Sequence, residues 1–128
     1  MERKRKMDGK EAILNYGNVS VGLGEEGEAV FRLRGEMDHH NVKKMREIMD
    51  EKLIDYRPSK VIIDLNEVTF TDSAGLGLIL GRYTRISGYG GTLMLVGVSE
   101  EFMKILRLAG TDKLMRIEKR STKKKIKV

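Results

Sequence analysis

One serine in this sequence is flanked by residues that suit reversible modification. Ser73 follows Asp72 and precedes Ala74 and Gly75, so it is the only hydroxyl between the aspartate and the glycine. Residues 61–65, just before this stretch, form an apolar run too short for a helix, which predicts a buried strand of parallel type. Apolar residues recur at helical spacing afterwards, so Ser73 is expected where a strand passes into a helix.

The start of a helix has its own chemistry. Backbone N–H groups in the first turn lack helical partners, and the positive end of the helix dipole lies there. Asp72 is predicted to cap this helix through its carboxylate. A phosphate on Ser73 would meet the backbone donors, but Asp72 would repel it, so modification here would act as a switch. The alternative is that Asp72 and Ser73 are only helix caps.

A second informative stretch, residues 35–40, contains Asp38 followed by two histidines. Asp38 is predicted to cap the next helix, with Met37 and Val42 as a hydrophobic staple. His39 and His40 are expected to be surface residues and not a metal site, because neighbours on a helix point about 100° apart. If the strands before Asp38 and Asp72 run parallel, both loops lie at the same edge of the sheet.

The helix that begins at Ser73 has two distinct faces. Its predicted core stripe consists of Leu76, Ile79, Leu80, Tyr83 and Ile86. The opposite side is expected to hold Ala74, Leu78, Gly81, Arg82 and Arg85. An exposed leucine beside a glycine suggests a face that a partner protein approaches closely. The alternative is that another element of the same chain covers that face.

The remaining chain predicts the elements that position these loops. Strands are expected at residues 12–16, 19–23, 29–34, 60–65, 92–96 and 114–117. Helices are expected to follow Asp38 as far as Arg57-Pro58, to span residues 73–87, and to follow a Ser99 cap with Ala109 facing inward. Alternating strands and helices predict a parallel sheet, to which the early strands add an antiparallel part. The prediction is one α/β domain with a mixed β-sheet and repeated β-α units.

Composition limits the classes of function. The chain has 128 residues, no cysteine and a net charge of +6, but residues 119–128 carry six basic and no acidic residues. We expect a flexible basic leader at 1–11, a folded domain at 12–118 and a flexible basic tail at 119–128. No apolar run reaches membrane-spanning length, and a cytoplasmic location is expected. Specific nucleic-acid binding is not expected, since no aromatic residues interleave the C-terminal lysines.

Enzymatic and cofactor chemistry find little support in the motifs. The spacing Gly75-x-Gly77-x-x-x-Gly81 fails the dinucleotide fingerprint, and no P-loop lysine follows. A hydrolase built on Asp38, Asp72 and Ser73 would lack a histidine base at a recognisable spacing. No cofactor, no metal and no catalytic residue are therefore expected.

The motifs resemble those of a known family. Residues 70–77, with Leu80-Gly81-Arg82-Tyr83 after them, are similar to the signature of STAS domains, and more narrowly of bacterial anti-sigma factor antagonists. Residues 35–40 are similar to the early motif of the sporulation-type antagonist. The resemblance implies a monomeric protein that binds an anti-sigma factor with serine kinase activity and so frees the sigma factor. It also implies that phosphorylation ends this binding and that a serine phosphatase restores it.

Carried over to this chain, the resemblance makes Ser73 the phospho-acceptor, flanked by Asp38 and Asp72. The expected partner-binding residues are Asp38, Asp72, Ser73, Ala74, Gly75, Leu78, Gly81, Arg82 and Arg85. Many family members have a second Ser or Thr where this chain has Ala74. An alternative within the same family is a STAS scaffold module in a stress-signalling complex.

Overall fold

A computed structural model describes residues 12–121 of the chain. The strands are β1 (Ala12–Tyr16), β2 (Val19–Leu23), β3 (Glu28–Met37), β4 (Lys60–Thr71), β5 (Thr92–Val98) and β6 (Arg116–Lys119). The helices are α1 (Val42–Tyr56), α2 (Ser73–Gly88) and α3 (Glu100–Leu108), and a short 3-10 turn, η1, spans Thr111–Lys113. The predicted leader at 1–11 and most of the predicted tail lie outside the described residues.

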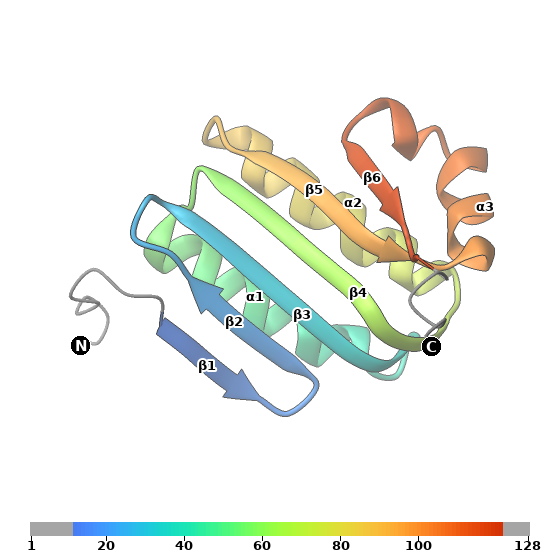
Figure 1. The fold of residues 1–128 in the computed structure, drawn as a ribbon, viewed down its shortest axis with the longest axis horizontal. Helices are drawn as coiled ribbons and strands as arrows, with labels where there is room; N and C mark the ends of the chain where they lie inside the picture. Colours follow the sequence, from blue (N-terminus) through green and yellow to red (C-terminus); the bar gives the residue numbers. More distant parts are fainter. Residues whose placement is uncertain (1–11, 122–128) are drawn as a thin grey trace, which may run out of the picture.

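All six strands form one sheet, and their spatial order is the order of the chain (Figure 1). The pairs β1–β2 and β2–β3 are antiparallel, whereas β3–β4, β4–β5 and β5–β6 are parallel. The mixed α/β architecture predicted from the sequence is therefore confirmed. Gly17, with φ of 71°, makes the tight turn of the first hairpin, because a left-handed backbone suits a residue without a side chain.

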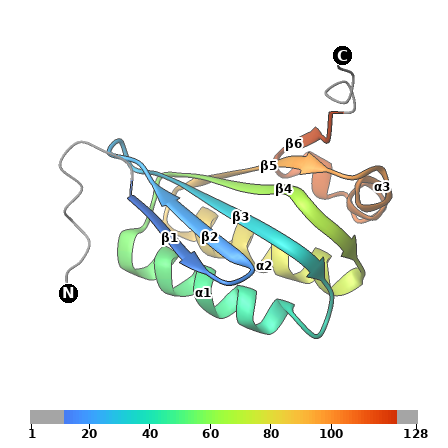
Figure 2. The ribbon, with the colours of Figure 1, turned by 60° about the horizontal axis from the view of Figure 1, so that its bottom comes forward.

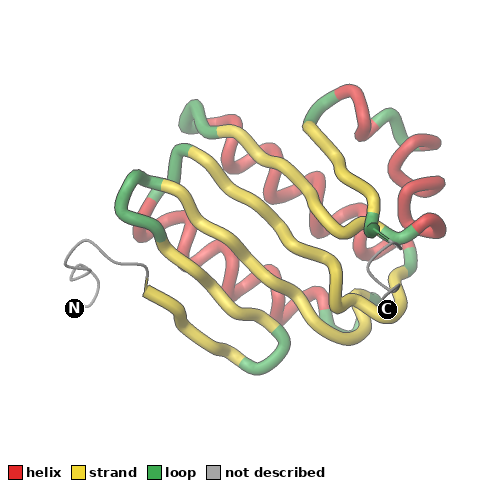
Figure 3. The backbone as a smooth tube through the Cα atoms, viewed as in Figure 1, coloured by secondary structure: helices red, strands yellow, loops and turns green. Residues whose placement is uncertain are grey.

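Helices α1 and α2 cover the same face of the sheet (Figure 2). Both belong to crossovers that step across the sheet in the same direction, and right-handed connections then place their helices on one side. Helix α3 lies at the β6 end of the molecule (Figure 1). Within residues 12–121, the other face of the sheet carries no helix, as the backbone trace in Figure 3 also shows.

The core lies between the sheet and this pair of helices. One buried residue from each of four neighbouring strands stands in register across the sheet: Val21, Phe31, Ile63 and Leu95. The helices bury Met45, Met49 and Leu53 of α1 and Ile79 and Ile86 of α2 against them. Burying each side chain of this size contributes about 1.5–3 kcal/mol.

The central strands β3 and β4 are longer than predicted. The sequence predicts that the second of these strands ends at residue 65, and a connector at residues 66–70 follows, where Asn66, Glu67 and Thr69 are polar. Instead, β4 continues to Thr71 and pairs with β3 as far as Met37, through two register shifts. The irregular pairing lets the two strands extend together despite the polar residues, so they end side by side.

Helix ends follow local chemistry in most places. The Ser99 side chain accepts a hydrogen bond from the Phe102 N–H at 3.1 Å, which confirms the predicted cap of α3. Helix α1 ends at Tyr56, before Arg57, as predicted. The prediction that Ala109 faces inward is wrong, because it follows the last turn of α3 and is exposed.

The folded part of the chain extends beyond the predicted boundary at residue 118. Lys119 belongs to β6, and the Arg120 side chain donates hydrogen bonds to backbone carbonyls of β4 and β5. Lys119 and Arg120 therefore belong to the folded part of the chain and not to the predicted tail. None of the helices in the described region is both long enough and apolar enough to span a membrane.

Candidate functional site

The loops that follow β3 and β4 meet at one edge of the sheet. Met37 and Thr71 are paired residues at the ends of these strands, and the Thr71 hydroxyl donates a hydrogen bond to the Met37 carbonyl at 3.2 Å. Asp38 and Asp72 come directly after this pair. The predicted placement of both loops at the same edge is therefore confirmed.

The Asp38 carboxylate organises the β3–α1 loop rather than the helix itself. Its Oδ1 accepts hydrogen bonds from the backbone N–H groups of His40 and Asn41, at 3.1 and 3.0 Å. Helix α1 begins later, at Val42, with Asn41 at the N-cap position and no side-chain cap. The prediction that Asp38 caps this helix is wrong, because its carboxylate instead closes the turn at residues 38–41, which precedes the helix.

Asp72 and Ser73 lie as the sequence predicts. The Asp72 Oδ1 accepts a hydrogen bond from the Ala74 N–H at 2.8 Å, so Asp72 is the N-cap of α2. Ser73 is the first residue of the helix and is exposed. The nearby hydroxyl of Thr71 is half-buried and bonded to backbone carbonyls, so Ser73 presents the accessible hydroxyl of this stretch.

Gly75 lets the first turn of α2 approach the strand ends closely. A Cβ at this position would collide with the Thr71 hydroxyl and with the Met37 methyl group. The glycine is buried, and its N–H donates a hydrogen bond to the Asp72 carbonyl at 2.9 Å. Gly75 is thus a packing requirement that fixes where Ser73 lies, rather than an exposed partner contact.

The expected exposed face of α2 is largely covered by α1. Leu78 and Arg82 keep only 4% and 6% of their surface exposed. The Asp50 carboxylate on α1 forms ion pairs with Arg82 and Arg85, with Nε–Oδ1 distances of 2.9 and 3.1 Å. Of the two alternatives left open for this face, the structure shows the second for Leu78 and Arg82, because a neighbouring helix of the same chain covers them. These two residues are therefore not the exposed partner contacts that the resemblance implied.

The three other members of that predicted face are only partly covered. Gly81 and Ala74 are half-buried, and the Arg85 side chain is 43% exposed. Sequence periodicity identified this face correctly but could not say which helix packs against it. What stays accessible around Ser73 therefore lies toward the loops and the strand ends.

An exposed aromatic residue that sequence reasoning did not single out lies beside the serine loop. Phe70 keeps 53% of its surface exposed, which is unusual for a large apolar side chain. It lines a pocket of about 400 Å³ at the carboxyl edge of the sheet. The other lining residues are Val68, Thr69, Thr71, Ser99, Glu101 and Arg120. A large apolar side chain three residues before Ser73 was the available sequence signal.

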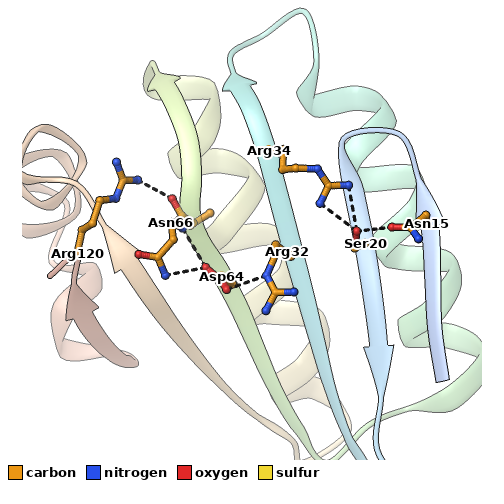
Figure 4. Close-up of polar contacts among 8 residues, drawn as sticks. Asn15, Ser20, Arg32, Arg34, Asp64, Asn66 and Arg120 are labelled. Atoms are coloured by element: carbon orange, nitrogen blue, oxygen red, sulfur yellow. Dashed lines mark hydrogen bonds and ion pairs between the residues drawn. The ribbon is translucent and has the colours of Figure 1, made fainter. Parts of the chain in front are cut away.

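Arg120 holds the irregular end of β4 in place. Its guanidinium donates to the carbonyls of Leu65, Val68 and Gly97, at 2.5, 3.2 and 3.0 Å. Figure 4 shows the Arg120 side chain reaching toward β4. Leu65 and Gly97 lie where the regular strand pairing is interrupted, so the guanidinium supplies donors at an irregular part of the sheet. A residue predicted to lie in a tail thus supports the strand that leads to Ser73.

Asp64 is the second support of this strand, on the helix-free face. It accepts hydrogen bonds from the Arg32 side chain and from Asn66, at 3.0 and 2.9 Å (Figure 4). Burial alone would raise the pKa of Asp64, but the Asn66 backbone and Arg32 outweigh it and hold this pKa below its usual value.

The two histidines lie in the β3–α1 loop, and both are exposed. The His39 Nδ1 is 3.9 Å from the Asp72 Oδ2, so the loop after β3 reaches across to the loop after β4. Across residues 12–121, no cluster of three or more His, Asp or Glu side chains is arranged to hold a metal ion. The site thus consists of an exposed hydroxyl at a helix start, two aspartates and a histidine.

Comparison with known proteins agrees with this architecture. The STAS domain family model matches residues 23–123. The anti-sigma F factor antagonist of Paenibacillus polymyxa is 36% identical over 91 residues, covering 71% of this chain and 78% of that protein. The anti-sigma-B factor antagonist of Bacillus subtilis strain 168 is 26% identical over 107 residues, covering 81% and 94%.

Solved structures show the same fold. The anti-sigma factor antagonist SpoIIAA in its unphosphorylated form aligns with a TM-score of 0.60 at 22% identity, covering 90% of this chain and 92% of that one. A putative anti-sigma factor antagonist from Thermotoga maritima aligns with a TM-score of 0.71 at 20% identity, covering 82% and 88%. Since the family model matches residues 23–123, which is well over half of the sequence, the chain belongs to the STAS-domain family.

Proposed function

We propose that this protein is an anti-sigma factor antagonist whose binding to an anti-sigma factor is controlled by phosphorylation of Ser73. The observation that carries the proposal is the exposed Ser73 hydroxyl at the start of α2, next to the Asp38 loop. In its unmodified form the protein binds an anti-sigma factor that is also a serine kinase, and thereby frees the sigma factor. It acts by binding and not by catalysis of its own.

The relatives support the class of partner. The curated proteins from Paenibacillus polymyxa and Bacillus subtilis are antagonists of anti-sigma factors, for sigma F and sigma B respectively. SpoIIAA has also been solved in a phosphorylated form, which aligns with this chain at a TM-score of 0.60 and 23% identity. A fold of this type therefore accommodates a phosphoryl group.

The proposed switch is a transfer of one phosphoryl group. The kinase moves the γ-phosphoryl of ATP to the Ser73 Oγ, the hydroxyl gives up its proton, and ADP leaves. The new group carries about −1.5 to −2 charges at neutral pH. It stands on a contact surface that already holds Asp38 and Asp72, where like charges cost several kcal/mol on binding. A serine phosphatase restores the hydroxyl and the binding.

The surface offered to the kinase is centred on the two loops. Asp38, Asp72, Ser73 and Ala74 remain in the proposed contact surface, and Phe70 joins them. Leu78 and Arg82 support this surface from behind, through α1, instead of contacting the partner. Arg85 and Gly81 lie at its margin. Because one copy of the chain presents the whole surface, we propose that the monomer is the active form.

The experiment that tests this function is intact-mass spectrometry after incubation with ATP and the kinase-type anti-sigma factor of the same organism. We expect one added phosphate, mapped to Ser73 and absent from Ser73→Ala. Thr71→Ser is the matched control, since it keeps the neighbouring hydroxyl and should be modified like the wild type. In a binding assay Ser73→Ala should bind the kinase and Ser73→Asp should lose at least a hundredfold in affinity. Tight binding by Ser73→Asp would contradict the switch.

A further inference from the structure

His39 is the residue by which the β3–α1 loop reaches the cap of α2. Its Nδ1 lies 3.9 Å from the Asp72 Oδ2, and its side chain is 85% exposed. The other Asp72 oxygen, Oδ1, is occupied by the Ala74 N–H. The imidazole therefore faces the outer side of the carboxylate that directly precedes Ser73.

The loop that carries His39 is held in a defined conformation. The Asp38 carboxylate ties the backbone N–H groups of His40 and Asn41, and the Asn41 side chain donates to the Glu36 carbonyl at 3.0 Å. These bonds fix the backbone of the turn from which the imidazole projects. The ring of His40 stands edge-on to the His39 ring, with centroids 6.2 Å apart.

Two carboxylates lie near the imidazole along the two loops. Asp72 faces His39 from the start of α2, and Asp38 precedes it on its own loop. Among the described residues, His39 is the basic side chain that forms an ion-pair contact with Asp72. A phosphate on Ser73 would add further negative charge beside this carboxylate. A phosphate beside a histidine favours the protonated imidazole, and histidine is the side chain that changes charge near neutral pH.

We propose that protonated His39 is the counter-ion of phosphorylated Ser73 and holds the phosphate between the two loops. The proposal rests on the function proposed above, since it describes the modified state of the same site. His39 is a positioning residue here: its ring N–H donates to a phosphate oxygen, and the phosphate is drawn over the Asp38 loop that an unmodified protein presents to its partner. The state that does not bind the kinase is thereby coupled to pH.

Nuclear magnetic resonance of the two imidazole rings tests the proposal directly. Full-length protein carrying phosphoserine at position 73, incorporated during synthesis, is titrated beside unmodified protein. We expect the pH at the midpoint of the His39 ring titration to rise by about half a unit on phosphorylation, and that of His40 to rise by less than half as much. The titration midpoint of the phosphoserine phosphorus resonance should in turn lie at higher pH in His39→Gln than in wild type. In His40→Gln this midpoint should equal the wild-type value.

The rise of the His39 midpoint on phosphorylation should also become smaller at high salt, because both His39 and Ser73 are exposed to solvent. Equal midpoint shifts in the two histidines, or no shift in either, would overturn the proposal. Phosphoserine made without the kinase separates this outcome from the proposed function. Failure of the kinase to modify Ser73 would contradict the function while leaving the titration result intact.

Discussion

Arg82 of α2 lies 2.9 Å from Asp50 of α1, between two helices that carry the two loops of the site. The contact is an ion pair rather than a well-directed hydrogen bond, and it is almost fully shielded from water, with 8% and 19% of the side chains exposed. Burial lowers the pKa of Arg82, and the Asp50 charge opposes that effect. The pair fixes α2, which begins at Ser73, against α1.

Replacing Asp50 should therefore destabilise the fold strongly. Asp50→Ala leaves the buried Arg82 without its counter-charge, and we expect a loss of about 3 kcal/mol in the free energy of unfolding. Urea denaturation measures it. Asp55→Ala on the exposed side of the same helix is the matched control and should change stability by less than about 0.5 kcal/mol. Equal effects of the two substitutions would show that the ion pair does not hold the helices together.

Two glycines of the same helix should respond in opposite directions to alanine. Gly75→Ala places a methyl group against Thr71 and Met37, so we expect a loss of about 1–3 kcal/mol of stability. Nothing lies within 4 Å of the position that a Cβ would take at Gly77. Gly77→Ala should therefore add about 0.5–1 kcal/mol through its higher helix propensity. Thermal unfolding of the two variants checks both signs, and a gain from Gly75→Ala would refute the close approach.

Phe70 should contribute to binding of the anti-sigma factor without contributing much to the fold. Phe70→Ala removes an exposed aromatic side chain beside Ser73, and we expect at least a tenfold loss of affinity with little change in stability. Ile54→Ala is the control, because Ile54 is equally exposed, at 59%, but lies near the end of α1. Calorimetric titration with the kinase measures both. If Phe70→Ala binds with wild-type affinity, Phe70 is not part of the contact surface.

Asp64 should make stability fall in acid. Its pKa is lowered in the folded protein relative to an unfolded value of about 3.9, so its contribution is present above that pH and disappears as the pH falls through the folded pKa. Asp64→Asn should thus be less stable than wild type at pH 7, and the gap should close below about pH 4. Denaturant unfolding between pH 7 and pH 2.5 measures the gap, with Asp55→Asn as the control. A gap that is constant with pH would exclude this role.

Local signals in the sequence predicted the elements well where one chemical feature dominates. The caps Asp72 and Ser99, the hairpin at Gly17 and the helix end before Pro58 each depend on neighbouring residues. The exposed Ser73 follows from its place after Asp72. The mixed sheet and the shared edge of the two loops followed from the alternation of strands and helices, whereas the spatial order of the strands was not predicted.

Features that depend on distant contacts were missed. The periodicity of α2 shows that Leu78 and Arg82 share a face but does not contain the information that α1, with Asp50, covers it. The length of β4 depends on pairing with β3, which outweighs its polar residues. Arg120 looked like one more basic tail residue, because its three carbonyl partners lie 23 to 55 positions away.

The spatial order of the strands, which repeats their order in the chain, has a consequence for how the protein is made. Each strand from β2 onward pairs with the strand just before it, so a newly synthesised segment always finds its neighbour already formed. Native pairing can then advance from the first hairpin toward β6 while translation continues, with a single hairpin turn or helical crossover to complete at each step. Ser73 is synthesised near the middle of this path, and Arg120, which supports the strand that leads to it, is synthesised after β6.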